Sequence, residues 1–98
     1  MIDEKEWLKL LKKEGFKELV VHLIGGPNDV VEVHTHDKHT VHVVLEGEVS
    51  LTDKNGTKTI RQGERFEFSP GTIHSGKCGP QGCRSIVGLR EEENIRRV

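Results

Sequence analysis

The chain has 98 residues, of which 33% are hydrophobic and 32% are charged, and its formal net charge at pH 7 is -1. This length supports one domain with a thin core, and the balanced charge excludes the basic surface that nucleic-acid-binding proteins present. The charged N-terminal segment does not resemble an apolar signal sequence, and no apolar run approaches the roughly 20 residues of a membrane span. We therefore expect one cytoplasmic domain over residues 1–98, with neither nucleic acid nor a membrane as its partner.

Residues 1–15 are predicted to form a short helix on the outside of the domain. Asp3 and Glu6 have the spacing of a capping box, in which a side chain at the helix start accepts a hydrogen bond from a backbone N–H three residues later. Gly15 suits the left-handed conformation that often follows a helix. Apolar side chains recur on one side of this segment, at Trp7, Leu8, Leu10 and Leu11.

Residues 16–90 are predicted to form a barrel of short antiparallel strands, and the charged residues 91–98 a loosely ordered tail or a helical end. The expected strands are 16–24, 30–36, 40–45, 48–52, 57–61, 64–69 and 83–89. Turns that contain glycine separate them, including those at 25–29 and 54–56 and a hairpin tip at 79–82. Many short strands with such turns favour an all-β sandwich or barrel.

Four of the six histidines lie between positions 34 and 42. Residues two apart on a strand point to the same face, so the imidazoles of His34 and His36 can converge on one ion. Two exposed histidines on a strand face would produce the same pattern, so this pair alone does not establish a metal site. His74, which follows a Pro-Gly turn after the alternating strand at 64–69, is the third candidate ligand.

Two segments resemble the motifs of the cupin superfamily. The segment HTHDKHTVHVVLEGEVSL at 34–51 resembles the first motif, in which HxH is followed by a glutamate and finally a glycine. The segment from Gly63 to His74 resembles the second motif, with a histidine eleven positions after a glycine, although Pro70 comes one place later than usual. With the piece that joins them, the two segments span most of residues 25–75.

The resemblance implies an all-β fold, the double-stranded β-helix or jelly-roll barrel of cupins, with the short N-terminal helix outside it. In that barrel the two motifs form neighbouring strands, so His34, His36 and His74 are expected to meet around one metal ion. The expected ion is a divalent transition metal. Its identity stays open among Fe, Mn, Zn, Ni and Cu, because nitrogen ligands alone do not select among these. The alternative is a cupin that has lost its metal and retains the histidines as polar lining of its pocket.

One position departs from the cupin pattern, because Thr40 stands where the motif places its glutamate. A hydroxyl is a poor ligand beside a carboxylate, so the resemblance implies that an oxygen donor is missing. His42 shares a strand face with Thr40 and is a candidate fourth ligand, whereas His39, in the preceding turn, is expected to be solvated. His22, on an earlier strand and without a partner by spacing, is expected to be structural.

Glu32 lies on the same predicted strand face as His34 and is the candidate catalytic residue. Its carboxylate would support the metal site or face the substrate as a general base. A salt bridge at an exposed strand end is the alternative. Three neutral imidazoles leave the +2 charge of an ion uncompensated, which favours anionic or enolate-like ligands and acidifies bound water.

A metal-dependent enzyme that acts on a small molecule is the leading functional prediction. Cupins with three histidine ligands resemble the thiol and diketone dioxygenases, so the resemblance implies a dioxygenase first and leaves an isomerase or a hydrolytic enzyme open. The alternative prediction is a non-catalytic module that binds a small ligand or a metal.

The strand face opposite the histidines is apolar and needs a cover. It carries Val31, Val33, Val41, Val43 and Leu45. The N-terminal helix with Trp7 is one candidate cover and a second subunit is the other. Small cupins are commonly dimers, so the resemblance implies a homodimer.

Cys78 and Cys83 are the only cysteines, and they flank the predicted hairpin tip. The tip would set them opposite one another, so a cross-strand disulfide is one alternative. Two free thiols are the expected state, because the cytosol is reducing.

Overall fold

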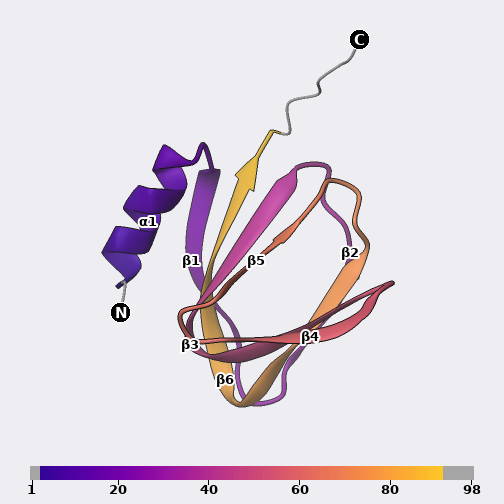
Figure 1. The fold of residues 1–98 in the computed structure, drawn as a ribbon. Helices are drawn as coiled ribbons and strands as arrows, with labels where there is room; N and C mark the ends of the chain where they lie inside the picture. Colours follow the sequence, from indigo (N-terminus) through magenta and orange to yellow (C-terminus); the bar gives the residue numbers. More distant parts are fainter. Residues whose placement is uncertain (1–2, 92–98) are drawn as a thin grey trace.

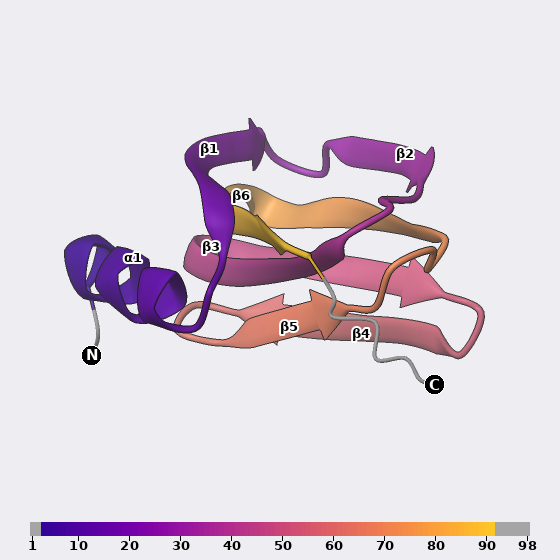
Figure 2. The ribbon, with the colours of Figure 1, turned by 90° about the horizontal axis from the view of Figure 1, so that it is seen from above.

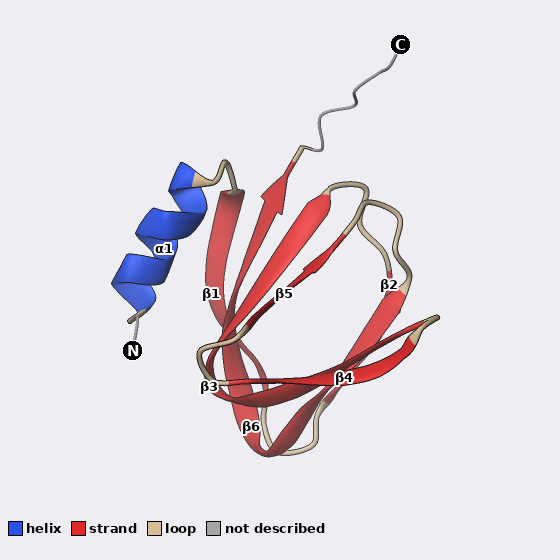
Figure 3. Cartoon of the chain, viewed as in Figure 1, coloured by secondary structure: helices blue, strands red, loops and turns tan. Residues whose placement is uncertain are grey.

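The computed structural model describes residues 3–91, except for the side chains of residues 22–24. Its elements are α1 (Glu4–Lys13), β1 (Lys17–Gly25), β2 (Val30–His34), β3 (His39–Asp53), β4 (Gly56–Arg61), β5 (Arg65–Phe68) and β6 (His74–Arg90). The predicted all-β fold with one N-terminal helix is confirmed (Figure 3). Within the described residues, no helix has the length and apolar character needed to cross a membrane. The predictions for the His22 side chain and for the tail beyond Glu91 lie outside the described residues.

Two long strands, β3 and β6, run through both sheets of the barrel (Figure 1). In the first sheet Ile86 of β6 pairs with Val43 of β3, and β1 and β5 form the edges. In the second sheet Gly76 of β6 pairs with Leu51 of β3, and β2 and β4 form the edges. The strand orders are therefore β1-β6-β3-β5 and β2-β6-β3-β4, and the sheets spread apart from the end where β3 and β6 bend (Figures 1 and 2).

Both long strands bend at glycines. The pairing moves by two residues on β3, from Gly47 to Val49, while it moves by five on β6, so residues 79–82 form a bulge. Gly47 has a φ of +75°, and a Cβ at this position would collide with the carbonyl oxygen of Gly82. Glycine is therefore required for the two backbones to approach this closely.

The strand breaks predicted at these glycines are wrong. Residues 40–45 and 48–52 belong to the single strand β3, and the segment 79–82 is a bulge within β6 rather than a hairpin tip. A glycine with positive φ can end a strand or bend it, and pairing with a distant strand decides between the two outcomes. The local sequence carries no information about that pairing.

Two apolar clusters pack on opposite faces of the first sheet. The cluster between the sheets contains Val44, Val49, Leu51, Ile60, Phe68, Cys78 and Cys83. The cluster beneath α1 contains Trp7, Leu11, Phe16, Val41, Val43 and Ile86. Of the two candidate covers for the apolar face, the helix packs on Val41 and Val43, which are fully buried, whereas Val33 is 68% exposed. Each fully buried aliphatic side chain contributes about 1.5–3 kcal/mol to the stability of the fold.

The outer face of the second sheet is polar. Hydroxyl groups pair across β3 and β4, with Ser50 Oγ 3.1 Å from Thr59 Oγ1 and Thr52 Oγ1 2.7 Å from Thr57 Oγ1. Cross-strand pairs of this kind contribute roughly 0.2–1 kcal/mol each. The helix α1 packs on the first sheet instead (Figure 2).

Polar contacts fix α1 at both of its ends. The Asp3 carboxylate accepts a hydrogen bond of 2.9 Å from the Glu6 N–H, as the capping spacing predicts. At the other end the Glu14 carboxylate lies 2.7 Å from the Arg65 guanidinium of β5. The backbone carbonyl oxygen of Glu14 accepts a 2.9 Å hydrogen bond from Arg90 of β6. The helix is therefore held by side chains from two strands of the sheet that it covers.

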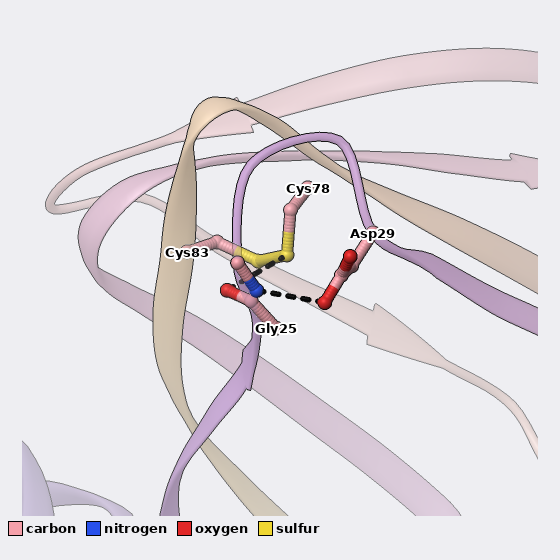
Figure 4. Close-up of a disulfide and its surroundings, with 5 residues drawn as sticks. Gly25, Asp29, Cys78 and Cys83 are labelled. Carbon is pink, nitrogen blue, oxygen red and sulfur yellow. Dashed lines mark hydrogen bonds between the residues drawn. A yellow bond between two sulfur atoms is a disulfide. The ribbon is translucent and has the colours of Figure 1, made fainter.

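Cys78 and Cys83 form a disulfide across the bulge of β6 (Figure 4). The expectation of two free thiols is wrong in this structure, because the bulge brings the two Cα atoms to 5.3 Å, within the usual range for bridged cysteines. Both residues belong to the cluster between the sheets. The bridge lies beside the turn in which the Asp29 carboxylate accepts a 2.8 Å hydrogen bond from the Gly26 N–H.

Replacing Gly47 by Ala is expected to lower the free energy of unfolding by about 2–4 kcal/mol, because the new Cβ collides with backbone and the φ is positive. The matched control is Gly63→Ala, where φ is +86° but no heavy atom lies within 4 Å of the added carbon. There only the conformational cost of about 1–2 kcal/mol applies. Urea unfolding measures both values, and equal losses would contradict the close contact at the bend.

Candidate metal centre

Three histidines gather at the end of the second sheet that is remote from the bend. His34 is the last residue of β2 and pairs with His74, the first residue of β6. His36 follows two residues after β2, in the segment that leads to β3. One ring nitrogen from each of the three lies within 4.8 Å of the other two. The structure therefore brings together the three histidines that the sequence singled out.

Strand β2 is shorter than predicted and contains an irregularity. It ends at His34, so His36 lies outside it, and its pairing with β6 shifts between Val31 and His34. Val31 pairs with Gly76 and His34 pairs with His74, and residues 74 and 76 share a face because they are two apart on β6. The prediction that Val31 lies on the face opposite His34 is therefore wrong.

Backbone carbonyls set the tautomer of two of the rings. His34 Nδ1 lies 2.7 Å from the carbonyl oxygen of Glu32, and His74 Nδ1 lies 3.0 Å from that of Thr72. Because a carbonyl can only accept, each Nδ1 carries the proton and donates it. The lone pair of each ring is therefore on Nε2, and metal-binding histidines are typically held in this way.

His74 carries a buried acceptor that needs a partner. The residue is 2% exposed, and within residues 3–91 its Nε2 has no hydrogen-bond partner. Leaving such an atom unsatisfied costs about 1–3 kcal/mol, which a bound cation would remove. Phe68 stacks on the ring with a centroid distance of 3.8 Å and an interplanar angle of 9°, which fixes its orientation. The donor set and this unsatisfied nitrogen fit a divalent transition metal.

Two of the histidines are held in the neutral form that binds metals. Burial is the main cause that lowers the pKa of His74, and the neighbouring His34 and His36 lower it further. The carbonyl of Thr72 and the carboxylate of Asp53 act in the opposite direction. The pKa of His36 is also lowered, first by burial and then by His34. Protons compete with metals for these nitrogens, so the lowered pKa values favour metal binding near neutral pH.

The spacing of the ring nitrogens is compatible with one shared metal ion. Nitrogens bound at 2.0–2.1 Å around a tetrahedral ion lie about 3.4 Å apart. The ring nitrogens here all lie within 4.8 Å of one another, so a bound ion would require a closure of at most about 1.4 Å.

His42 lies near His74, and Thr40 lies two residues before His42 on β3. Thr40 is fully buried, and its hydroxyl donates a 3.2 Å hydrogen bond to the carbonyl oxygen of Lys38. The His42 ring is edge-on to that of His74, with a centroid distance of 6.4 Å. Within the described part of the chain, the group of ligand atoms that lie within 4.8 Å of one another does not include His42.

His39 and Glu32 differ from their expected surroundings. His39 begins β3, its Nε2 lies 2.6 Å from Glu67 Oε1, and its ring packs 5.9 Å from Phe16. The expectation of a solvated turn residue is therefore wrong. The Glu32 side chain is exposed, and the contact that this residue makes with the cluster is the one from its backbone carbonyl to His34.

A cleft of about 570 Å³ lies between the β3–β4 turn, β5 and residues 69–73, and its lining includes Phe68, which stacks on His74. Phe66, Phe68, Ile73 and Asp53 are part of its lining. Sequence reasoning singled out neither Phe68, which stacks on His74, nor Asp53, which lines the cleft. The alternation of Phe66 and Phe68 was a usable signal for an inward face, but nothing near Asp53 in the sequence indicates that the cleft includes it.

In the metal-free protein at neutral pH, His34 and His74 are expected to carry their proton on Nδ1, and His74 to titrate below the unfolded chain. Two-bond ¹H–¹⁵N correlation spectra report both properties, and the same protein in urea is the control, with a pKa of about 6.5. Because the folded pKa of His74 is the lower one, the unfolded state binds its proton more tightly, and this group removes stability as the pH falls below about 6.5. A proton on Nε2 of His74, or a pKa as high as in urea, would contradict the described environment.

The fold is similar to those of solved cupins. A cupin superfamily protein from Desulfitobacterium hafniense has a TM-score of 0.63 and 10% identity, covering 78% of this chain and 80% of that one. An RmlC-like cupin from Shewanella frigidimarina has a TM-score of 0.63 and 23% identity, covering 76% and 67%. The formate complex of oxalate decarboxylase from Lactobacillus farciminis has a TM-score of 0.66 and 22% identity, covering 79% of this chain but 24% of that one. These similarities show the fold, the double-stranded β-helix.

Sequence comparison identifies the family. A search of curated proteins found no match. A family model described as an AraC-like ligand binding domain matches residues 16–88, which is more than half of the chain and includes the three clustered histidines. The resemblance to the cupin superfamily is confirmed, and the chain belongs to the family of AraC-like ligand-binding domains, which have the cupin fold.

Proposed function

We propose that the protein is an enzyme that depends on one divalent transition metal, Fe, Mn, Zn, Ni or Cu, and acts on a small molecule. His34, His36 and His74 would hold the ion through ring nitrogens, with Nε2 as the ligand atom of His34 and His74. The observation that carries the proposal is the buried Nε2 of His74, which has no hydrogen-bond partner among the described residues.

The chemistry of the site follows from its charge. When bound, the metal supplies a Lewis acid that polarises an oxygen of the small molecule. Three neutral imidazoles do not compensate the +2 charge, so the site favours ligands with an anionic oxygen. Formate, named in the complex of the similar oxalate decarboxylase, is a suitable first probe of this preference.

Other residues complete the proposed site. His42 is proposed as a fourth ligand, because its ring lies beside that of His74 on the inner face. The Glu32 carboxylate, which is exposed in the middle of β2, is proposed as a general base that acts on the small molecule. The carbonyl of Glu32 supports the site directly by orienting His34.

A non-catalytic module that binds a small ligand is the second candidate. The matching family model is described as a ligand binding domain, and ligand binding requires no turnover. Under this proposal the same histidines hold the metal, and the metal holds the ligand. The two candidates therefore share the site and differ in what happens to the bound molecule.

Replacing His34, His36 or His74 by Ala is expected to weaken zinc binding roughly 100-fold or more, because each change removes a ligand. Competition with a chromophoric chelator measures the affinity, and metal analysis of the purified protein identifies the native ion. His39→Ala is the matched control, because His39 contacts Glu67 and lies outside the cluster. Unchanged zinc affinity in the three variants would overturn the proposal.

Oxygen consumption by the metal-loaded protein distinguishes the enzyme from the module. We expect the iron-loaded protein to consume oxygen with small thiols or diketones, and the His74→Ala variant to consume none. Formate binding without turnover of any of these compounds would favour the non-catalytic module instead.

A homodimer and a cytoplasmic location are also proposed. Val30 and Val33 are 65% and 68% exposed on the edge strand β2, and they offer apolar surface that a second subunit would cover.

A further inference from the structure

Asp53 occupies the end of β3 next to the histidines. The ladder between β3 and β6 pairs Leu51 with Gly76 and Thr52 with Ser75, so the next step along it sets Asp53 beside His74. Leu51 belongs to the cluster between the sheets, and Asp53, two residues further, lies on the same inner face. His34 pairs with His74 from the other side. The three residues therefore form a row across three neighbouring strands.

The Asp53 side chain has one oxygen fixed by the turn. Its Oδ1 accepts a 2.8 Å hydrogen bond from the Asn55 N–H, which orients the carboxylate. Asp53 is half-buried and lines the 570 Å³ cleft together with Phe66 and Phe68. Oδ2 retains the capacity to accept from a molecule in the cleft.

The charge of Asp53 acts on the histidine cluster. Burial is the largest influence on the pKa of His74 and lowers it, while the Asp53 carboxylate is among the groups that raise it. This electrostatic interaction agrees with the position that the strand pairing gives to Asp53. In the described residues, the group of ligand atoms that lie within 4.8 Å of one another consists of histidine nitrogens and does not include Asp53.

The position where the cupin motif has its glutamate cannot supply a carboxylate. Thr40 stands there, and its hydroxyl donates to the carbonyl of Lys38. Together with the row described above, this points to a carboxylate that reaches the site from a different part of β3.

We propose that Asp53 supplies a carboxylate to this site from the end of β3 and accepts a hydrogen bond from a small hydroxy or amino acid whose own carboxylate binds at the histidines. The inference rests on the proposed metal site and names its ligand class. The carboxylate of the ligand compensates the positive charge of the metal. The O–H or N–H group next to that carboxylate donates a hydrogen bond to Asp53 on the cleft side.

The test compares acetate with glycolate, which differ by one hydroxyl group. Asp53→Asn keeps an oxygen for the Asn55 N–H but removes the negative charge. We expect zinc affinity to fall about 3- to 10-fold, because a nearby negative charge is lost. Acetate should bind the cobalt-loaded variant more tightly, because repulsion is reduced, and the preference of the wild-type protein for glycolate over acetate should disappear. Visible spectra of the cobalt-loaded full-length protein report both anions.

Two further variants separate charge from structure. Glu48→Gln removes a carboxylate from the same strand, where Glu48 lies 3.7 Å from Arg61, and should change none of these values. Asp53→Glu retains the charge and should keep zinc affinity close to that of the wild type. If Asp53→Asn binds zinc, acetate and glycolate as the wild type does, Asp53 is only a turn residue and the inference is overturned.

The inference is also overturned if zinc and both anions weaken together in Asp53→Asn and in Asp53→Glu, because the side chain then acts through the geometry of the turn. A wild-type protein that binds no zinc would refute the proposed function itself. Wild-type zinc binding without a preference for glycolate would refute only the role of Asp53.

Discussion

The backbone contact between Gly47 and Gly82 determines how two long strands serve two sheets. Because β3 and β6 bend there, each gives one half to each sheet, and the inner faces of the halves oppose one another. Aliphatic side chains and the disulfide fill the space near the bend. The polar residues of the site lie at the other end, where the sheets have spread apart (Figure 1).

Hydrogen bonds to the backbone and aromatic packing offset the free-energy cost of burying the polar rings of the histidine cluster. Two rings are anchored through Nδ1 to carbonyls two residues earlier, an arrangement that needs no further side chain. Stacking of Phe68 on His74 adds aromatic contact worth about 0.5–1.5 kcal/mol. The buried Nε2 of His74 has no hydrogen-bond partner among the described residues, so the site favours a cation there.

Sequence reasoning was successful where the determining contacts are local or belong to a motif. The capping of α1 by Asp3 and the cover over Val41 and Val43 follow from periodicity, and the meeting of the three histidines follows from the motif spacing. Sequence reasoning failed where the pairing of strands distant in the chain determines the local structure. The shift that turns Val31 inward and the bulge at 79–82 that closes the disulfide both depend on register with partners far away in the chain.

The same limit explains why the sequence analysis did not single out Phe68 and Asp53. The alternation of Phe66 and Phe68 with Arg65 and Glu67 places the two aromatic rings on one face, but the stacking of Phe68 on His74 depends on where β5 ends relative to β6. Asp53 resembles an ordinary turn residue before Asn55 and Gly56, and only the β3–β6 ladder relates it to the histidines.

The paired hydroxyl groups on the outside of the second sheet have a consequence for how so short a chain completes a barrel. The hydroxyl groups pair with each other, Ser50 with Thr59 and Thr52 with Thr57. They are also compatible with water, so this face of the sheet can remain exposed to solvent. One helix, α1, is therefore enough, because the apolar outer face that needs a cover is that of the first sheet. A protein that docked on this hydroxyl-bearing face would have to remove water from polar groups, which is costly. Apolar contacts are therefore favoured at the edge strand β2, where Val30 and Val33 are exposed.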